Sequence, residues 1–231
     1  MDGDSMKHTN ETIRRVYLTD LTLPDTFHGR STPKVKYINQ WECIPAYVKN
    51  EAVTIPTDGG NTWVLSDSHF FHKKIIEYTN RPFESVEEMN AVMVSNYKAV
   101  VKPDDIVIWC GDITFSQDSV INEILRSLPG YKIHILGNHD FDRSGKVKKL
   151  DVDERYICYV MNAKHKQREF QIIFSHYPIT KIPKNCVNVH GHLHLNVADP
   201  WNINVCVEHT SFTPIGLSDI VVRAYDYLES K

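Results

Sequence analysis

The sequence lacks the features that would place the protein in a membrane, outside the cell or on a nucleic acid. No stretch approaches the roughly 20 uninterrupted apolar residues that a membrane helix requires. Residues 1–15 are polar, so we expect no secretory signal. Lys and Arg (26) do not outnumber Asp and Glu (29), and the net charge of −3 argues against a broad nucleic-acid-binding surface. We therefore expect a cytoplasmic protein with no membrane contact and no extensive nucleic-acid binding.

Cysteine is scarce and is not arranged in pairs. The chain has five cysteines, no two of them spaced as CxxC, so we expect neither a disulfide framework nor a thiolate zinc site. All five lie in or beside apolar runs, which favours buried thiols in a reducing compartment. Histidine is abundant by contrast, with 12 residues, and several fall in short polar clusters directly after apolar runs.

The order of apolar and polar segments indicates an α/β fold. A chain of 231 residues forms one large domain or two small ones. We assign residues 1–60 to an N-terminal extension of unknown role, partly flexible, with short strands expected at 34–39 and 46–55. From residue 61 to residue 231 strands and helices alternate, which predicts a single domain.

The expected elements of this domain follow from periodicity and capping signals. Ser85 and Glu88 have the spacing of a capping box and predict the start of a helix, and Ser218 is expected to cap the last one. The segments 155–161 and 169–174 are expected to pair as a hairpin across the polar residues 162–168. The other strands are expected at 63–65, 106–110, 132–136, 187–189 and 202–207, and the other helices at 72–78 and 119–128.

Five of the apolar strands end in residues drawn from Asp, Asn, His and Gly. In open α/β sheets, ligands bind at the carboxyl ends of strands, so we expect these ends to meet at one edge. Residues i and i+2 at a strand end point the same way, which would let Asp67 and His69 hold one ion. The converging side chains would be Asp67, His69, Asp112, Asn138, His176, His192 and His194.

This set offers only nitrogen and oxygen ligands. It suits two borderline divalent cations, manganese foremost and otherwise iron, zinc, nickel or cobalt. It contains too much nitrogen for a dedicated calcium or magnesium site.

The five blocks occur in the order typical of a known family. They are Asp67-Ser-His69, Gly111-Asp112, Gly137-Asn-His-Asp140, the isolated His176 and Gly191-His-Leu-His194. With this series the chain resembles the calcineurin-like metallophosphoesterase superfamily. The tracts 66–72 and 80–83 resemble a small microbial and phage branch of it. The resemblance implies an α/β fold of two packed mixed β-sheets flanked by helices, a four-layer αββα sandwich.

The resemblance also implies roles for the site residues. One metal would be held by Asp67, His69, Asp112 and His194, and the other by Asp112, Asn138, His176 and His192, so that Asp112 bridges. His139 would lie near the leaving-group oxygen, and Asp140 would orient its imidazole.

The implied activity is hydrolysis of P–O bonds by a hydroxide shared between two metals. The short segment after His194 favours a small soluble substrate, and a nucleotide-type phosphodiester is our first expectation. A nucleotide phosphomonoester fits the same site. A different class, a catalytically silent scaffold that binds a protein partner, would be expected to lack ligands or His139, and here every position is filled. A nucleic-acid-binding module would instead show salt-dependent binding that survives chelation. The oligomeric state stays open.

Three further residues are candidates for contacts with the substrate phosphate. His72 lies one helical turn beyond His69, Arg81 carries a planar fork suited to phosphate, and Arg143 follows His139 by four residues. Surface capping is the alternative for His72 and Arg81. Among the remaining histidines, His134 is expected to face away from the site, and His190 to have a structural or outer-sphere role.

Overall fold

The computed structural model describes residues 26–27, 30–31, 47–54, 62–142 and 144–231, with side chains from residue 62 onward. The strand expected at 34–39 lies outside these residues. The described chain contains two five-stranded sheets and a separate two-stranded pair of β1 (Thr26–Phe27) and β2 (Arg30–Ser31). No helix in the described ranges is long and apolar enough to cross a membrane.

The first sheet has the strand order β12-β4-β5-β6-β7. The four strands from β4 to β7 run parallel to one another. The short edge strand β12 pairs antiparallel with β4. The strands are β4 (Thr62–Leu65), β5 (Ile106–Trp109), β6 (Tyr131–Ile135), β7 (Glu154–Tyr156) and β12 (Ile215–Gly216). Because β4, β5 and β6 are parallel, their carboxyl ends share one edge.

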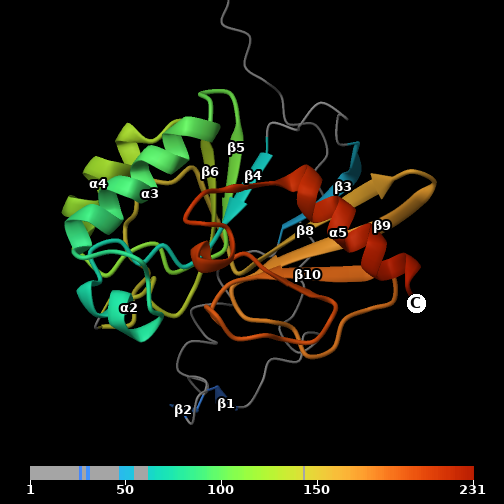
Figure 1. Ribbon diagram of the computed structural model, residues 1–231. Coiled ribbons are helices and arrows are strands. Elements are labelled where there is room, and N and C mark those ends of the chain that lie inside the picture. The colour runs from blue at the N-terminus through green and yellow to red at the C-terminus, as the bar shows by residue number, and fades with distance from the viewer. Residues whose placement is uncertain (1–25, 28–29, 32–46, 55–61, 143) are drawn as a thin grey trace, which may run out of the picture.

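Three helices pack on the outer face of the first sheet, at one side of the molecule (Figure 1). They are α2 (Lys73–Tyr78), α3 (Val86–Val100) and α4 (Asp118–Ser127). The Ser85 hydroxyl accepts a hydrogen bond from the N–H of Glu88, as the capping-box spacing predicts. The Glu88 carboxylate in turn accepts from the N–H of Glu84.

The second sheet has the order β11-β10-β9-β8-β3 and is mixed. Its strands are β3 (Tyr47–Thr54), β8 (Cys158–His165), β9 (Arg168–Ser175), β10 (Cys186–His190) and β11 (Asn202–Asn204). Only β8 and β9 are antiparallel. The edge strand β3 precedes residue 61, so the domain's second sheet takes in part of the segment expected to be an extension.

Two expected elements differ from the structure. The strand expected at 155–161 is divided, because β7 pairs with β6 in the first sheet while β8 joins β9 in the second. The hairpin turn is much shorter than the polar stretch 162–168, because β8 continues to His165 and β9 begins at Arg168. The last helix, α5 (Leu217–Glu229), begins after Gly216 and has no side-chain cap, so Ser218 does not cap it.

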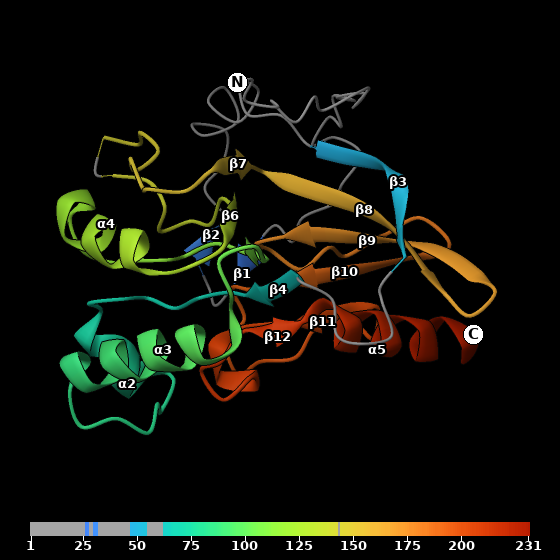
Figure 2. The same ribbon diagram turned by 90° about the horizontal axis from the view of Figure 1, so that it is seen from above.

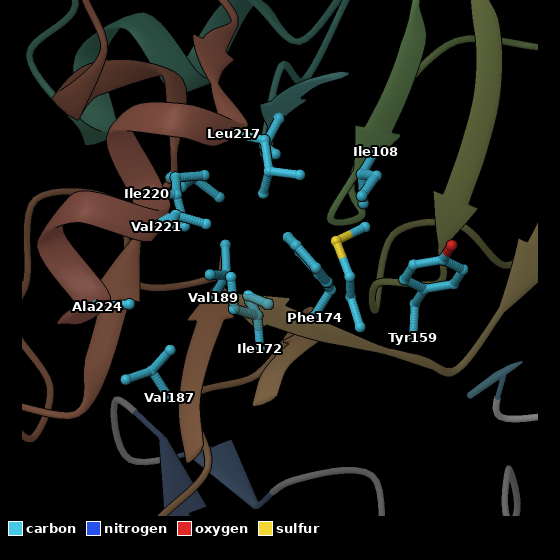
Figure 3. Close-up of a cluster of buried hydrophobic side chains, with 14 of the residues drawn as sticks. Ile108, Tyr159, Ile172, Phe174, Val187, Val189, Leu217, Ile220, Val221 and Ala224 are labelled. Atoms are coloured by element: carbon cyan, nitrogen blue, oxygen red, sulfur yellow. The ribbon is translucent and has the colours of Figure 1, made fainter. Parts of the chain in front are cut away.

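The main core lies between the two sheets. Alternate residues of the strands point into it, and α5 contributes its apolar face to the same cluster (Figure 3). Figure 2 shows α5 at the side of the molecule away from α3 and α4. The structure therefore confirms an α/β fold with two mixed sheets flanked by helices, and this packing holds the carboxyl ends of both sheets together.

Candidate metal centre

The carboxyl ends of five strands meet where the two sheets adjoin. The loop after β4 is bonded to the loop after β5 through the N–H of Asp67 and the carbonyl of Gly111, 3.1 Å apart. The loop after β9 reaches across the sheets, since Nδ1 of His176 lies 2.8 Å from the carbonyl oxygen of Cys110. The N–H of Gly191, after β10, donates to the carbonyl of His176. All seven expected ligands therefore lie in one cluster.

The first half of the cluster contains Asp67, His69, Asp112 and His194. Oδ1 of Asp67 lies 3.6 Å from Nε2 of His69 and 3.8 Å from Nε2 of His194. These separations exceed hydrogen-bond length. Oδ1 of Asp67 and both ring nitrogens of His69 are buried without a hydrogen-bond partner. Buried polar atoms are normally paired, so these atoms have the arrangement of ligands around a cation.

The second half contains Asn138, His176 and His192 together with Asp112. Oδ1 of Asn138 lies 2.9 Å from Nε2 of His176 and 3.0 Å from Nδ1 of His192. An amide oxygen facing two imidazole nitrogens is a donor set that a borderline divalent cation accepts.

Asp112 lies between the two halves. Its Oδ2 is 3.6 Å from Nε2 of His69 and 3.5 Å from Nε2 of His176. Its Oδ1 accepts a hydrogen bond from the N–H of His139 at 2.8 Å, which fixes the carboxylate plane. The residues present thus fit two divalent ions, and Asp112 would be the residue that both ions share.

The backbone that presents these ligands is left-handed rather than extended. Five of the expected ligand residues have positive φ angles, and residues other than glycine enter this region at a cost of about 1–3 kcal/mol each. These residues are Asp67 (56°), His69 (49°), Asp112 (53°), His192 (67°) and His194 (48°). The spacing alone had suggested that the i, i+2 pairs converge through strand pleating. They converge instead through tight left-handed turns.

Two glycines allow the loops to approach this closely. A Cβ on Gly191 would lie 2.0 Å from Oγ of Ser66 and 2.1 Å from Oδ2 of Asp67. Gly111 has a φ of +95°, and a Cβ there would lie 2.5 Å from Nδ1 of His176. Any larger residue at either position would displace a ligand.

The two central carboxylates have opposite pKa shifts. Burial alone raises the pKa of Asp67, but the charges of His176, His69 and His194 hold it well below its usual value. Burial and then the charges of Asp67 and Asp140 raise the pKa of Asp112 well above its usual value. Two buried carboxylates this close repel each other, and bound cations would relieve that repulsion.

Asp140 and His134 form a support beneath the centre. The Asp140 carboxylate accepts hydrogen bonds from the N–H groups of Asp112, Ile113 and Gly137 and lies 2.9 Å from Nε2 of His134. It is fully buried, and its hydrogen bonds go to these groups and not to the His139 ring, so it does not orient that imidazole as expected. It instead joins the loops after β5 and β6. His134 faces this site rather than away from it.

His139 lies at the open side of the cluster. Its side chain is 39% exposed, and its Nε2 is 4.0 Å from Oδ2 of Asp112. Burial, followed by the charges of His69 and His176, lowers the pKa of His139 to about 3. The ring is therefore neutral at pH 7 and carries one N–H.

Arg81 is part of the scaffold. Its Nη1 and Nη2 donate to the carbonyls of Ser68 and Asp67, and its Nε and Nη2 donate to Oε1 of Glu208. The side chain is fully buried, so it is not available to bind a substrate phosphate as expected. This corrects the expectation, because the guanidinium already donates its hydrogen bonds to the loop after β4 and to Glu208.

Glu208 is a functional residue that sequence reasoning missed. It lies in the short helix η2 (Val207–His209), and its Oε1 is 2.9 Å from Nδ1 of His194. The carboxylate therefore fixes which nitrogen of His194 faces Asp67, as carboxylates behind metal-binding histidines commonly do. In the sequence, Glu208 is marked only as an acidic residue that follows an apolar segment, which does not distinguish it from an ordinary surface residue.

The remaining candidates have other places. His72 stacks on Phe115, and burial lowers its pKa to about 4, so it is a neutral ring rather than a cation for phosphate. Arg143 lies outside the described residues. His190 is buried, with its Nδ1 2.7 Å from the carbonyl of Gly191, in agreement with a structural role.

Known proteins are similar to this chain in sequence and in fold. Residues 60–227 match the family model described as calcineurin-like phosphoesterase. The chain is 33% identical over 173 residues to an uncharacterized protein, MJ1445, of Methanocaldococcus jannaschii, covering 70% of this chain and 89% of that one. It is 40% identical over 85 residues to the Gene 66 protein of Mycobacterium phage L5, covering 35% of this chain and 40% of the phage protein. The solved structure of a protein of unknown function, AQ665 of Aquifex aeolicus, superposes with a TM-score of 0.52 at 29% identity, covering 69% of this chain and 96% of that one.

Proposed function

The chain belongs to the calcineurin-like phosphoesterase family, and we propose that it is a metal-dependent hydrolase of small nucleotide-type phosphodiesters. The position of Asp112 carries the proposal. One carboxylate oxygen within 3.6 Å of imidazoles from both halves of the cluster is suited to joining two cations. The set of carboxylate, amide and imidazole ligands favours manganese as the bound ion, with iron, zinc, nickel or cobalt as substitutes.

The chemistry that two such ions supply is charge neutralisation of the phosphate and activation of water at neutral pH. The protein's own residues would do the rest. Neutral His139, partly exposed beside Asp112, would donate a hydrogen bond from its ring N–H to the leaving oxygen. Asp140 and His134 would hold the loops that carry Asp112 and Asn138 in register. A hydrogen bond such as that from His139 stabilises the charge that develops on the leaving oxygen without transferring a proton, and losing one such donor typically costs roughly 10²–10³-fold in rate.

We further propose a cytoplasmic location. Four cysteines in the described part of the chain are buried free thiols, which suits a reducing compartment. A substrate that diffuses freely to an open site fits the partial exposure of His139 and the modest negative net charge.

Turnover of two chromogenic esters tests the proposal. The full-length protein, loaded with manganese, is expected to hydrolyse bis-p-nitrophenyl phosphate faster than p-nitrophenyl phosphate, and EDTA is expected to abolish both reactions. A reversed preference would identify a phosphomonoesterase with the same site. Failure to hydrolyse either ester while two ions remain bound would favour a silent scaffold and overturn the proposed activity.

A further inference from the structure

Phe115 is a large apolar side chain that the fold leaves open to solvent, with 48% of its surface exposed. Its ring lies parallel to the ring of His72, with centroids 4.0 Å apart and planes inclined by 8°. A second exposed ring, Tyr78, meets His72 edge-on at 6.2 Å. Three aromatic rings therefore form a continuous strip, of which Phe115 and Tyr78 are the exposed members.

This strip borders the candidate metal centre. The Phe115 ring centroid lies 5.0 Å from that of His139, and the His72 ring lies 5.5 Å from that of His69. His139 is in turn within 4.0 Å of Asp112. The exposed surface of Phe115 thus begins on the side of the centre where His139 would meet the leaving group.

The main chain that carries Phe115 is fixed. The N–H of Phe115 donates to the carbonyl of Phe70 at 2.9 Å, and the hydroxyl of Thr114 donates to the same oxygen. Nζ of Lys148 donates to the carbonyl of Thr114 at 2.7 Å. Isolated exposed apolar residues are common on protein surfaces. An exposed ring that is anchored at its backbone, stacked on one side and adjacent to a site is preorganised to bind, because little ordering remains to be done.

We infer that Phe115, backed by His72, is a specificity-determining platform for a planar aromatic group of the substrate, and that this group is a nucleobase. The inference rests on the proposed function, since it assumes a phosphate bound at the metal centre. In a nucleotide only the sugar separates the phosphate from the base. This matches the position of Phe115, because only the His139 ring lies between Phe115 and Asp112. Every base has a π-face, so the platform favours nucleotides over sugar phosphates without selecting among bases.

Calorimetric titration of the manganese-loaded, full-length protein tests this inference without requiring turnover. The probes are adenosine 5′-monophosphate and ribose 5-phosphate, which differ only in the base. Wild type is expected to bind the nucleotide about tenfold more tightly, the size of one base–aromatic stack. Phe115→Ala is expected to abolish that ratio, and Phe115→Trp to preserve it. Val120→Ala, which alters an exposed apolar residue of α4, is the matched control and is expected to leave the ratio unchanged.

Equal affinity of the two probes for wild type, or a nucleotide preference that survives in Phe115→Ala, would overturn the inference. The outcome is separable from that of the proposed function. Hydrolysis of the chromogenic esters without a preference for the nucleotide would reject the platform alone. A preference for the nucleotide that depends on Phe115, without hydrolysis of any ester, would support the platform and reject the phosphoesterase activity.

Discussion

Oε1 of Glu208 lies 2.9 Å from Nδ1 of His194, the imidazole whose Nε2 faces Asp67. Burial alone raises the pKa of Glu208, but the hydrogen bond to His194 and the charge of Arg81 lower it to about 2. Glu208 is therefore an anion at any physiological pH. Burial lowers the pKa of His194, yet the hydrogen bond to Glu208 and the charge of Asp67 together raise it above its ordinary value. Glu208 thus orients the imidazole of His194, which is one of the expected metal ligands.

Glu208→Gln is expected to weaken the binding of one of the two ions. Loss of a carboxylate behind a metal-binding histidine typically costs 10–100-fold in metal affinity. Manganese titration by calorimetry would show one weakened site and one site close to wild type. Glu229→Gln, which removes a surface carboxylate paired with Arg168, is the control and is expected to change neither. Unaltered affinity at both sites in Glu208→Gln would contradict the orienting role.

Arg81→Ala is expected to destabilise the protein rather than weaken substrate binding alone. Removing one partner of a buried ion pair typically costs about 3–5 kcal/mol, because the remaining Glu208 charge is left uncompensated. Urea unfolding measures this loss. Arg126→Ala breaks an exposed pair with Asp151 and should cost about 1 kcal/mol or less. A fully stable Arg81→Ala protein with a raised KM would restore the phosphate-binding interpretation.

His139→Asn is expected to lower kcat while leaving the metal content unchanged. The ring lies beside Asp112 but is not placed among the ligands, so only the donated N–H is lost. The expected decrease is roughly 10²–10³-fold, the cost of removing one hydrogen-bond donor to charge that develops in the transition state. Metal analysis of the purified variant provides the check, and loss of an ion would show that His139 is itself a ligand.

The metal-free protein is expected to lose stability as the pH falls. Burial lowers the pKa of His190 from 6.5 to about 4 in the folded state. Between these values the unfolded chain binds more protons than the folded one, so acidification favours unfolding, by at most about 1.4 kcal/mol per pH unit for one such group. Urea unfolding with EDTA at pH 7 and pH 5 should show a smaller loss for His190→Gln than for wild type. An equal loss in both proteins would exclude His190 as a contributor.

The sequence predicts the parts of the centre that follow directly from strand ends. Asp67, Asp112 and Asn138 each come after an apolar strand of the parallel part of the first sheet, so chain order alone places them at one edge. The histidines that follow β9 and β10 were predicted by the same strand-end rule, although these strands belong to the second sheet. The left-handed conformations of His69 and His192 could not be predicted, because the alternation of apolar and polar residues carries no information on the backbone angles of a loop.

The roles that the sequence did not reveal depend on contacts between distant segments. Arg81 and Glu208 are 127 positions apart, and their pairing exists only once η2 lies beneath the loop after β4. His134 alternates with apolar neighbours in β6 and gave no sign that Asp140 turns back toward it. The division between β7 and β8 was likewise not predicted, since only Ile157 separates the two strands in the sequence and they differ in the sheet to which they pair.

Manganese binding to wild type and to Asp112→Asn tests the central claim most directly. With one carboxylate oxygen within reach of both halves of the cluster, wild type is expected to bind two ions per chain, and Asp112→Asn is expected to weaken both together. Binding of a single ion by wild type, or loss of only one ion in Asp112→Asn, would contradict a centre that is shared through Asp112.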